Sequence, residues 1–288
     1  MTTLPTTWDL QSPAKLNLML HIVGRKPDGY HELQTLFQLL NYGDTLHITT
    51  NNTGQIQLET EFAGVPAEDN LIIRAARMLQ DATKCKKGAT IGVTKLLPMG
   101  GGLGGGSSNA ATTLVGLNAL WKTGLSTEKL CEMGLSLGAD VPVFIQGHSA
   151  WAEGVGEQLT PVSLPNDWFL VIFPQVLVNT GLIFSHPDLT RNTPITTIPT
   201  ALTGEGHNDC ESVVRQAYPA VDQALNWLNQ HVTAKLTGTG SCIFGTFDSQ
   251  EAAERLLDTM PNTFTGFVAQ GVNDSPLQAQ IRKITTTQ

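Results

Sequence analysis

The chain has 288 residues, of which 41% are hydrophobic and 15% are charged, and its formal net charge is −8 at pH 7. At the usual ~150 residues per domain, this length favours two domains, each with enough apolar residues for a core without disulfides or metal. The low charge content excludes a coiled coil or a disordered acidic tail. An acidic chain also repels the phosphate backbone of nucleic acids, which excludes them as the main partner.

The cysteines and the first residues of the chain indicate in which cellular compartment the protein is expected. Four cysteines are spread along the chain without a Cys-x-x-Cys pair, which favours reduced thiols over a zinc site or a disulfide framework. Met1–Leu10 has no basic start and no apolar stretch, and the longest apolar run, Trp168–Phe173, is far shorter than the ~18 residues of a membrane span. We therefore expect a cytoplasmic protein that contacts no membrane.

The first predicted element is a strand over residues 14–21. Its apolar residues alternate with polar ones, which places Lys15 and Asn17 side by side on an open face. The elements predicted next are strands over 45–50 and 55–61 joined as a hairpin, a helix capped by Asp69 or Asn70, a strand over 90–97, and helices over 107–121 and 127–137.

The second half of the chain begins with a glycine-rich stretch, 147–156, that we interpret as the passage between two lobes. The elements predicted after it are a strand over 169–173, a polar connection over 179–206, a helix over 210–229, two strands within 235–247, and a helix over 250–260. Strands and helices alternate without the regular rhythm of a parallel sheet, so the predicted fold class is α+β.

A glycine tract carries the strongest functional signal. Six of the seven residues from Gly100 to Gly106 are glycine, and Ser107, Ser108 and Asn109 follow as good helix N-caps. Glycines let the backbone approach a ligand closely, and the free N–H groups and dipole of a helix N-terminus favour an anion. Strand, glycine loop and helix start therefore predict a phosphate-binding site, with a plain hinge as the alternative.

Two common phosphate-binding motifs fit this tract poorly. A P-loop has Lys and then Ser or Thr after its last glycine, whereas Gly106 is followed by two serines. A dinucleotide-binding pattern is present at Gly100, Gly102 and Gly105, but Pro98 interrupts the strand exit, and no strand ending in an acidic residue follows ~20 residues later. A nicotinamide-dependent oxidoreductase stays as an alternative that NAD binding would reveal.

The tract from Pro98 to Ala111 resembles the ATP-binding loop of the GHMP kinases. Residues 12–18 look like the first motif of that superfamily, and residues 236–242 look like its third. The resemblance implies a two-lobed α+β fold, with a ribosomal-S5-like ATP-binding lobe over residues 1–155 and a ferredoxin-like lobe over 156–288 that contributes to the substrate site. It also implies ATP with Mg²⁺ as the cofactor and small molecules as partners, whereas the sequence predicts no particular oligomeric state.

Four further segments narrow the resemblance: residues 25–35, 68–71, 137–144 and 152–157. They are similar to the branch that phosphorylates the 2-hydroxyl of 4-diphosphocytidyl-2-C-methyl-D-erythritol, a cytidine diphosphate-linked sugar alcohol of the non-mevalonate isoprenoid pathway. The alternatives are a homoserine- or phosphomevalonate-type kinase of the same superfamily and a nucleotide-binding regulator without catalysis.

The resemblance implies roles for individual residues. Lys15 is expected to stabilise charge on the attacking oxygen, and Asp140 to act as general base. Substrate contacts are expected from Asn17, Tyr30, His31, Thr180 and Phe184, with Tyr30 and Phe184 stacking on the cytosine and His31 bonding its edge. The ATP contacts expected are Asn70, Lys95, Pro98, Met99, Gly100, Gly101, Gly102, Leu103, Gly104, Gly105, Gly106, Ser107 and Ser108, and Ser108 is also the candidate Mg²⁺ ligand.

Structural alternatives stand beside several of these roles. Lys15 and Lys95 fit ordinary solvated strand residues, and Asn70 fits a helix cap. Asp140 precedes Pro142 as an N-cap would. Phe184 equally fits a core position.

Overall fold

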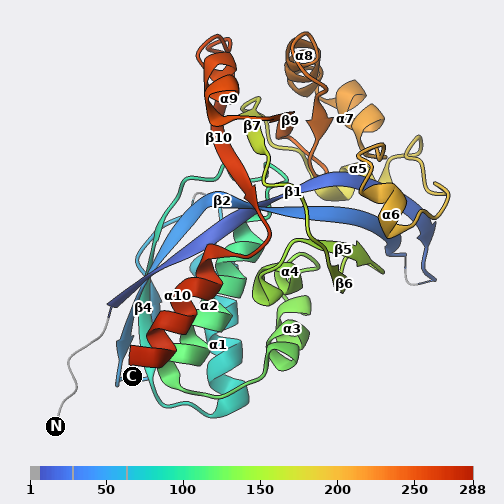
Figure 1. The fold of residues 1–288 in the computed structure, drawn as a ribbon. Helices are drawn as coiled ribbons and strands as arrows, with labels where there is room; N and C mark the ends of the chain where they lie inside the picture. Colours follow the sequence, from blue (N-terminus) through green and yellow to red (C-terminus); the bar gives the residue numbers. More distant parts are fainter. Residues whose placement is uncertain (1–6, 28, 63, 288) are drawn as a thin grey trace.

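The computed structural model describes residues 7–27, 29–62 and 64–287. Two long antiparallel strands, β1 (Thr7–Arg25) and β2 (His31–Asn51), run through the whole molecule (Figure 1). The predicted strand over 14–21 lies within β1, but its second face is not open, since Lys15 and Asn17 are buried. The reason is that groups from far along the chain cover both side chains: the Gly102 carbonyl and Asp140 contact Lys15, and Thr237 contacts Asn17.

The sheet continues with β4 (Gly88–Thr94), which pairs antiparallel with β2, and β3 (Ile56–Leu58), which pairs parallel with β4. The predicted hairpin between 45–50 and 55–61 is therefore wrong, because β4 lies between those two segments. Helix α1 (Leu71–Thr83) connects β3 to β4, and a parallel pair requires such a crossover.

Helices cover one face of this part of the sheet (Figure 1). They are α1, α2 (Gly105–Trp121), α3 (Thr127–Leu135), α4 (Val141–Gln146) and the C-terminal α10 (Pro276–Thr287). The short η1 (Ala67–Asp69), which precedes α1, is exposed. The predicted helix is confirmed as α1, and of the two candidate caps Asn70 is the one used, since its side chain accepts from the amide of Ile72. Helix α10 was not predicted, although its Leu277 and Ile284 are fully buried in the same core as α2.

The interpretation of residues 147–156 as an interlobe passage is wrong. They contain β5 (Ala150–Glu153), which pairs with β2 and with β6 (Gln158–Pro161). Trp151 in β5 is almost completely buried, so this segment is part of the sheet and its core.

The second part of the molecule is an antiparallel sheet in the order β10–β7–β9–β8, joined to the first part by pairing of β10 with β2. Its strands are β7 (Trp168–Phe173), β8 (Lys235–Leu236), β9 (Ile243–Phe247) and the unpredicted β10 (Thr265–Val272). Its helices are α5 (Thr180–Ser185), α6 (Ile198–Ala201), α7 (Glu211–Ala217), α8 (Pro219–Leu228) and α9 (Gln250–Leu257).

Two predictions for this part need correction. The helix expected over 210–229 is two helices, since Pro219 has no amide hydrogen to continue α7 and instead opens α8. The expected polar connection over 179–206 contains α5 and α6. The predicted α+β class is confirmed, and within the described ranges no helix is long and apolar enough to cross a membrane.

Candidate active site

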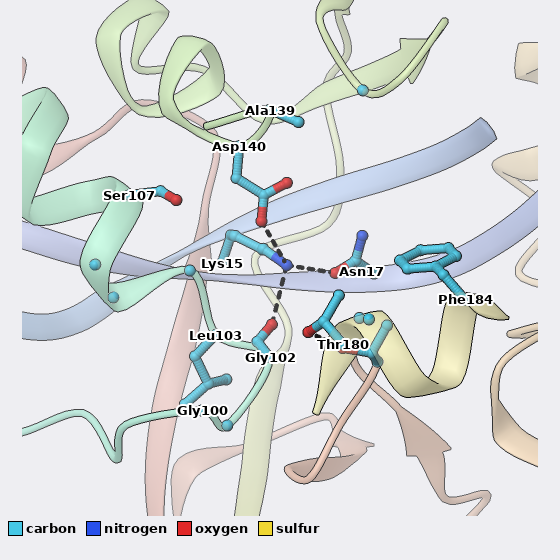
Figure 2. A pocket seen from close by; sticks show the side chains of 18 of the residues that line it. Lys15, Asn17, Gly100, Gly102, Leu103, Ser107, Ala139, Asp140, Thr180 and Phe184 are labelled. Atoms are coloured by element: carbon cyan, nitrogen blue, oxygen red, sulfur yellow. Dashed lines mark hydrogen bonds and ion pairs between the residues drawn. The ribbon is translucent and has the colours of Figure 1, made fainter. Parts of the chain in front are cut away.

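A cavity of about 1000 Å³ lies where β1, the glycine loop, the start of α4 and α5 meet (Figure 2). Its volume is at the upper end of the range for small-molecule sites, which leaves room for a nucleotide and a second substrate. Every predicted site residue except Ser108 lines it: Lys15, Asn17, Tyr30, His31, Asn70, Lys95, Pro98 through Ser107, Asp140, Thr180 and Phe184.

Ser108 is placed differently from the prediction. Its side chain is fully buried, and its Oγ lies 2.8 Å from the hydroxyl of Ser12 beneath the loop. A hydroxyl in this position is not presented to a ligand in the cavity, so the expectation of Ser108 as a Mg²⁺ ligand is not supported. Ser107 lines the cavity instead.

Helix α2 begins earlier than the sequence predicts. Its N-cap is Gly104, at φ 73°, and this residue supplies no side-chain cap; the amide of Ser108 donates to the Gly104 carbonyl at 2.8 Å. Ser107 and Ser108 thus lie inside the first turn and do not cap the helix. The first-turn amides of residues 105–107 have no intrahelical acceptor, and these residues line the cavity. They form the kind of N-terminus that binds anions.

The glycine loop packs too closely for side chains at two positions. A Cβ on Gly102, which has φ 75°, would lie 2.3 Å from the carbonyl oxygen of Thr237 in the turn between β8 and β9. A Cβ on Gly104 would lie 2.8 Å from Phe144 and 3.2 Å from Cε of Lys15. Glycine therefore lets the loop contact the β8–β9 turn and the lysine at the same time.

Lys15 is held by three oxygens at the centre of the cavity (Figure 2). Its Nζ donates to Asn17 Oδ1 at 2.6 Å and to the Gly102 carbonyl at 2.9 Å, and it lies 3.3 Å from Asp140 Oδ2. The Lys15 side chain is 3% exposed, which contradicts the alternative of a solvated strand lysine. Asn17 is fixed in turn, since its Nδ2 donates to Thr35 Oγ1 at 2.8 Å.

Asp140 occupies the N-cap position of α4, ahead of Pro142, but its side chain makes no capping hydrogen bond. The carboxylate faces Lys15 and keeps 33% of its surface exposed. One oxygen is thus paired with an ammonium group while the side chain stays accessible from the cavity. This arrangement suits a group that exchanges a proton with a bound molecule.

Aromatic residues gather at the other end of the cavity. The rings of His31 and Phe184 stack with their centroids 5.1 Å apart, and Tyr30 lies at the rim with 66% of its surface exposed. Phe184 lines the cavity and also packs against the apolar core of the second part of the molecule, which fits its expected core position; its stacking on cytosine stays a prediction. The Thr180 hydroxyl lies 2.8 Å from that of Thr239. Burial, followed by the charges of two arginines, lowers the pKa of His31.

Asn70 and Lys95 line the cavity and also have structural bonds. Asn70 Oδ1 accepts from the amide of Ile72 at 3.0 Å and so caps α1. The ammonium of Lys95 pairs with Asp44 at 2.5 Å, and its side chain is 25% exposed. Lys95 is therefore not an ordinary solvated lysine, and the alternative given for it is wrong.

Asp44 is a residue that the sequence analysis missed. Its carboxylate is completely buried and accepts hydrogen bonds from Lys95 and from the backbone amides of Leu96 and Leu97. It also accepts one from Asn109 on α2 at 3.2 Å. Asp44 therefore ties the entry and exit of the glycine loop together, yet no motif or spacing around it indicates this.

Thr237 lies in the segment over 236–242 that resembles the third motif, and the sequence analysis gives it no role of its own. Its hydroxyl accepts from the backbone amide of Asn17 at 3.0 Å and lies 3.3 Å from the Gly102 carbonyl. The motif resemblance was the signal available for it. Arg25, Thr35 and Asp69 also line the cavity, and they lie in the segments over 25–35 and 68–71 that narrow the resemblance. Phe37, Phe62 and Val65 line it without such a signal.

Comparison with known proteins shows which family the chain matches. The family model described as the GHMP kinases N terminal domain matches residues 70–148, and the GHMP kinases C terminal model matches residues 192–266. A 4-diphosphocytidyl-2-C-methyl-D-erythritol kinase of Pseudomonas fluorescens is 55% identical over 275 residues, covering 96% of this chain and 97% of the relative. One from Marinobacter nauticus is 55% identical over 280 residues, covering 96% and 98%.

Solved structures agree with the sequence relatives. The crystal structure of a 4-(cytidine 5'-diphospho)-2C-methyl-D-erythritol kinase matches with a TM-score of 0.80 and 29% identity, covering 92% of this chain and 99% of that one. The homoserine kinase of Cytophaga hutchinsonii shares the fold, with a TM-score of 0.68 at 17% identity over 96% of this chain and 97% of that one. Because relatives that are 55% identical match nearly the full chain, the chain belongs to the 4-diphosphocytidyl-2-C-methyl-D-erythritol kinase family of the GHMP kinase superfamily.

Proposed function

We propose that this chain transfers the terminal phosphoryl group of ATP to the 2-hydroxyl of 4-diphosphocytidyl-2-C-methyl-D-erythritol, in the non-mevalonate pathway to isoprenoid precursors. The observation that carries the proposal is the Lys15–Asp140 pair, 3.3 Å apart, beside the uncapped start of α2 in one cavity. Relatives with this activity in their names match nearly the full chain.

The pair would act on the acceptor alcohol. Asp140 would take the proton of the 2-hydroxyl, since its carboxylate is accessible from the cavity. A carboxylate is a weak base, so the ammonium of Lys15 would favour the developing alkoxide and offset charge on the transferring group. Asn17 would act as a positioning residue, because its Oδ1 holds the ammonium at 2.6 Å.

The glycine loop would hold ATP. The free amides of residues 105–107 form the positive end of α2, which would bind the phosphates, and Asn70 and Lys95 would lie at the adenine side. Within the described residues no cluster of three or more His, Cys, Asp or Glu side chains could hold a metal ion. Mg²⁺ bound through the nucleotide phosphates fits this site, since Mg²⁺ is commonly held by one or two carboxylates and substrate phosphates. Mg²⁺ would neutralise phosphate charge, and the hydroxyl of Ser107, which lines the cavity, would be an oxygen donor to it.

The aromatic end would recognise the cytidine. Tyr30 would stack on the base, and His31 would bond its edge. The stack between His31 and Phe184 covers one face of the histidine ring, so Phe184 would hold His31 as well as line the base pocket. Thr180, bonded to Thr239, would contact the substrate between the two ends.

The location of the protein and its lobe boundary complete the proposal. All four cysteines are free thiols, which supports the expected location in the reducing cytoplasm. The lobe boundary between residues 155 and 156 stays a prediction.

A substrate panel tests the proposed reaction. The full chain with ATP and Mg²⁺ is offered the cytidyl methylerythritol, homoserine, phosphomevalonate, or no acceptor, and ADP release is followed. We expect ADP only with the cytidyl acceptor, and loss of that preference when Tyr30 or His31 is replaced by alanine. Release of ADP with homoserine or phosphomevalonate at an equal rate would contradict the substrate assignment.

A further inference from the structure

We propose that Arg191 is a positioning residue that fixes His31 as a hydrogen-bond donor through Nδ1 and thereby selects cytosine over uracil. The inference deepens the proposed function and rests on it, because it assumes that His31 meets the pyrimidine edge. Arg191 itself does not line the cavity, so it would act only through His31 and the α5 backbone.

The hydrogen bonds of Arg191 determine which nitrogen of His31 carries the proton. The guanidinium Nε donates to Nε2 of His31 at 3.2 Å. A guanidinium has donors only, so Nε2 must offer its lone pair. In the neutral ring the hydrogen then lies on Nδ1.

The same guanidinium fixes the aromatic partner of His31. Its other donors bind the carbonyls of Phe184 at 3.0 Å, His186 at 2.7 Å and Leu189 at 3.0 Å. Phe184 in turn stacks on the His31 ring. Arg191 therefore holds both the edge and the covered face of His31, which leaves the Nδ1 edge for a ligand.

Burial and the neighbouring charges both favour the neutral form of His31. All four acceptors of Arg191 are uncharged, and across the described ranges no carboxylate forms an ion pair with it. Arg25 on β1 adds a second positive charge near the His31 ring. On the side of α5, the ring contacts Phe184, which is uncharged. Burial first, and then Arg191 and Arg25, lowers the pKa of His31. A proton on Nε2 would also break the bond to Arg191.

A fixed donor distinguishes the two pyrimidines. Cytosine presents an unprotonated N3 that accepts from Nδ1–H, whereas uracil presents an N3–H donor that would oppose it. A site that leaves buried polar groups unpaired rejects the wrong ligand strongly. We expect the wild-type chain to prefer cytidyl over uridyl substrate by on the order of tenfold to a hundredfold in kcat/KM.

The first test is the ring state of His31 in the free full chain, by ¹⁵N NMR of its imidazole. We expect a protonated Nδ1 and an unprotonated Nε2 near neutral pH. In Arg191→Met the Nε2–H form should appear, and the pKa of His31 should rise toward its ordinary value because one positive charge is gone. A wild-type spectrum with hydrogen on Nε2 would overturn the proposal even if the variant failed to fold.

The second test compares KM for the cytidyl and uridyl substrates in Arg191→Met, with Arg74→Met on the exposed side of α1 as the matched control. The variant should lose the cytidyl preference at neutral pH while its KM for ATP stays unchanged, and the control should keep both. Protonation restores a donor at Nδ1, so the cytidyl KM of the variant should improve as the pH falls through the pKa of His31.

Equal discrimination by wild type and variant would overturn the role of Arg191. A wild-type chain that phosphorylates neither substrate would instead contradict the proposed function, and the NMR spectrum alone would then decide whether Arg191 fixes the donor state of His31.

Discussion

At the scale of single residues, Lys15 and Asp44 carry charges that are almost entirely removed from solvent. Burying a charge is costly unless it is paired and hydrogen-bonded. Lys15 has three oxygen neighbours, and Asp44 has four donors. Both networks hold parts of the glycine loop, so we infer that they serve its geometry.

Replacing Asp44 tests the second network. Asp44→Ala leaves Lys95 and two loop amides without their acceptor, and we expect a loss of ~3–5 kcal/mol in the free energy of unfolding, as for other broken buried pairs. The KM for ATP should rise, because Lys95 and the loop both lose their anchor. Urea unfolding and initial-rate kinetics measure these effects.

Asp9→Ala is the matched control, since Asp9 pairs with His47 at the surface with its side chain 68% exposed. That substitution should change stability by less than ~1 kcal/mol. An Asp44→Ala protein that unfolds at the same urea concentration as the control would contradict the anchoring role.

Site residues that lie in motifs could be predicted from the sequence. Residues that act through partners far away in the sequence could not. Lys15 and Asp140 were predicted together, and they lie 3.3 Å apart; their catalytic roles stay predictions. Asp44 and Arg191 bind groups contributed by other elements. Nothing in the local spacing shows such partners, because they are brought together only by tertiary packing.

At the scale of elements, the glycine loop lies between the start of α2 and the turn that joins β8 to β9. The amide of Cys242 donates to the Gly101 carbonyl at 3.0 Å, and Gly102 contacts Thr237. The loop thus joins the two sheets at the cavity. Its shape depends on glycine at the points of closest approach.

Gly102→Ala tests this packing. The new Cβ would meet the Thr237 carbonyl at 2.3 Å, and the backbone φ of 75° disfavours any side chain. We expect destabilisation of ~1–3 kcal/mol and weaker ATP binding, measured by urea unfolding and by nucleotide titration.

Gly106→Ala provides the control for folding. Its Cβ would come no closer than 3.8 Å to Leu71, and the position lies within α2. Alanine there should leave stability unchanged or raise it by up to ~1 kcal/mol. Equal unfolding midpoints for the two variants would show that close packing at Gly102 is not what shapes the loop.

Elements with a strong local pattern were predicted well, and elements defined by pairing were not. The capped helix α1 and the apolar strand β7 match their predictions. The parallel pairing of β3 with β4 follows from a crossover that composition does not show. Strand β10 alternates weakly and is stabilised by pairing with β7 and β2.

At the scale of the whole molecule, the last two elements of the chain, β10 and α10, return to its first part. Helix α10 at the C-terminal end returns to the first core, beside α2 and β1 (Figure 1). Strand β10 pairs with both β7 and β2 and so links the two parts of the sheet. The motifs were enough to predict a two-lobed α+β fold. They do not predict where α10 and β10 pack, because those positions depend on contacts between residues far apart in the sequence.

The central claim is that β1 and α4 bring Lys15 and Asp140 together to act as one unit on an alcohol. A double-mutant cycle of Lys15→Ala and Asp140→Ala measures this most directly, through the single-turnover rate of ADP formation with ATP, Mg²⁺ and the cytidyl acceptor. Each single variant should lose about a hundredfold or more in rate while still binding ATP, and the double variant should be no slower than the worse single one. Two independent losses that multiply in the double variant, or undiminished turnover in either single one, would contradict the account.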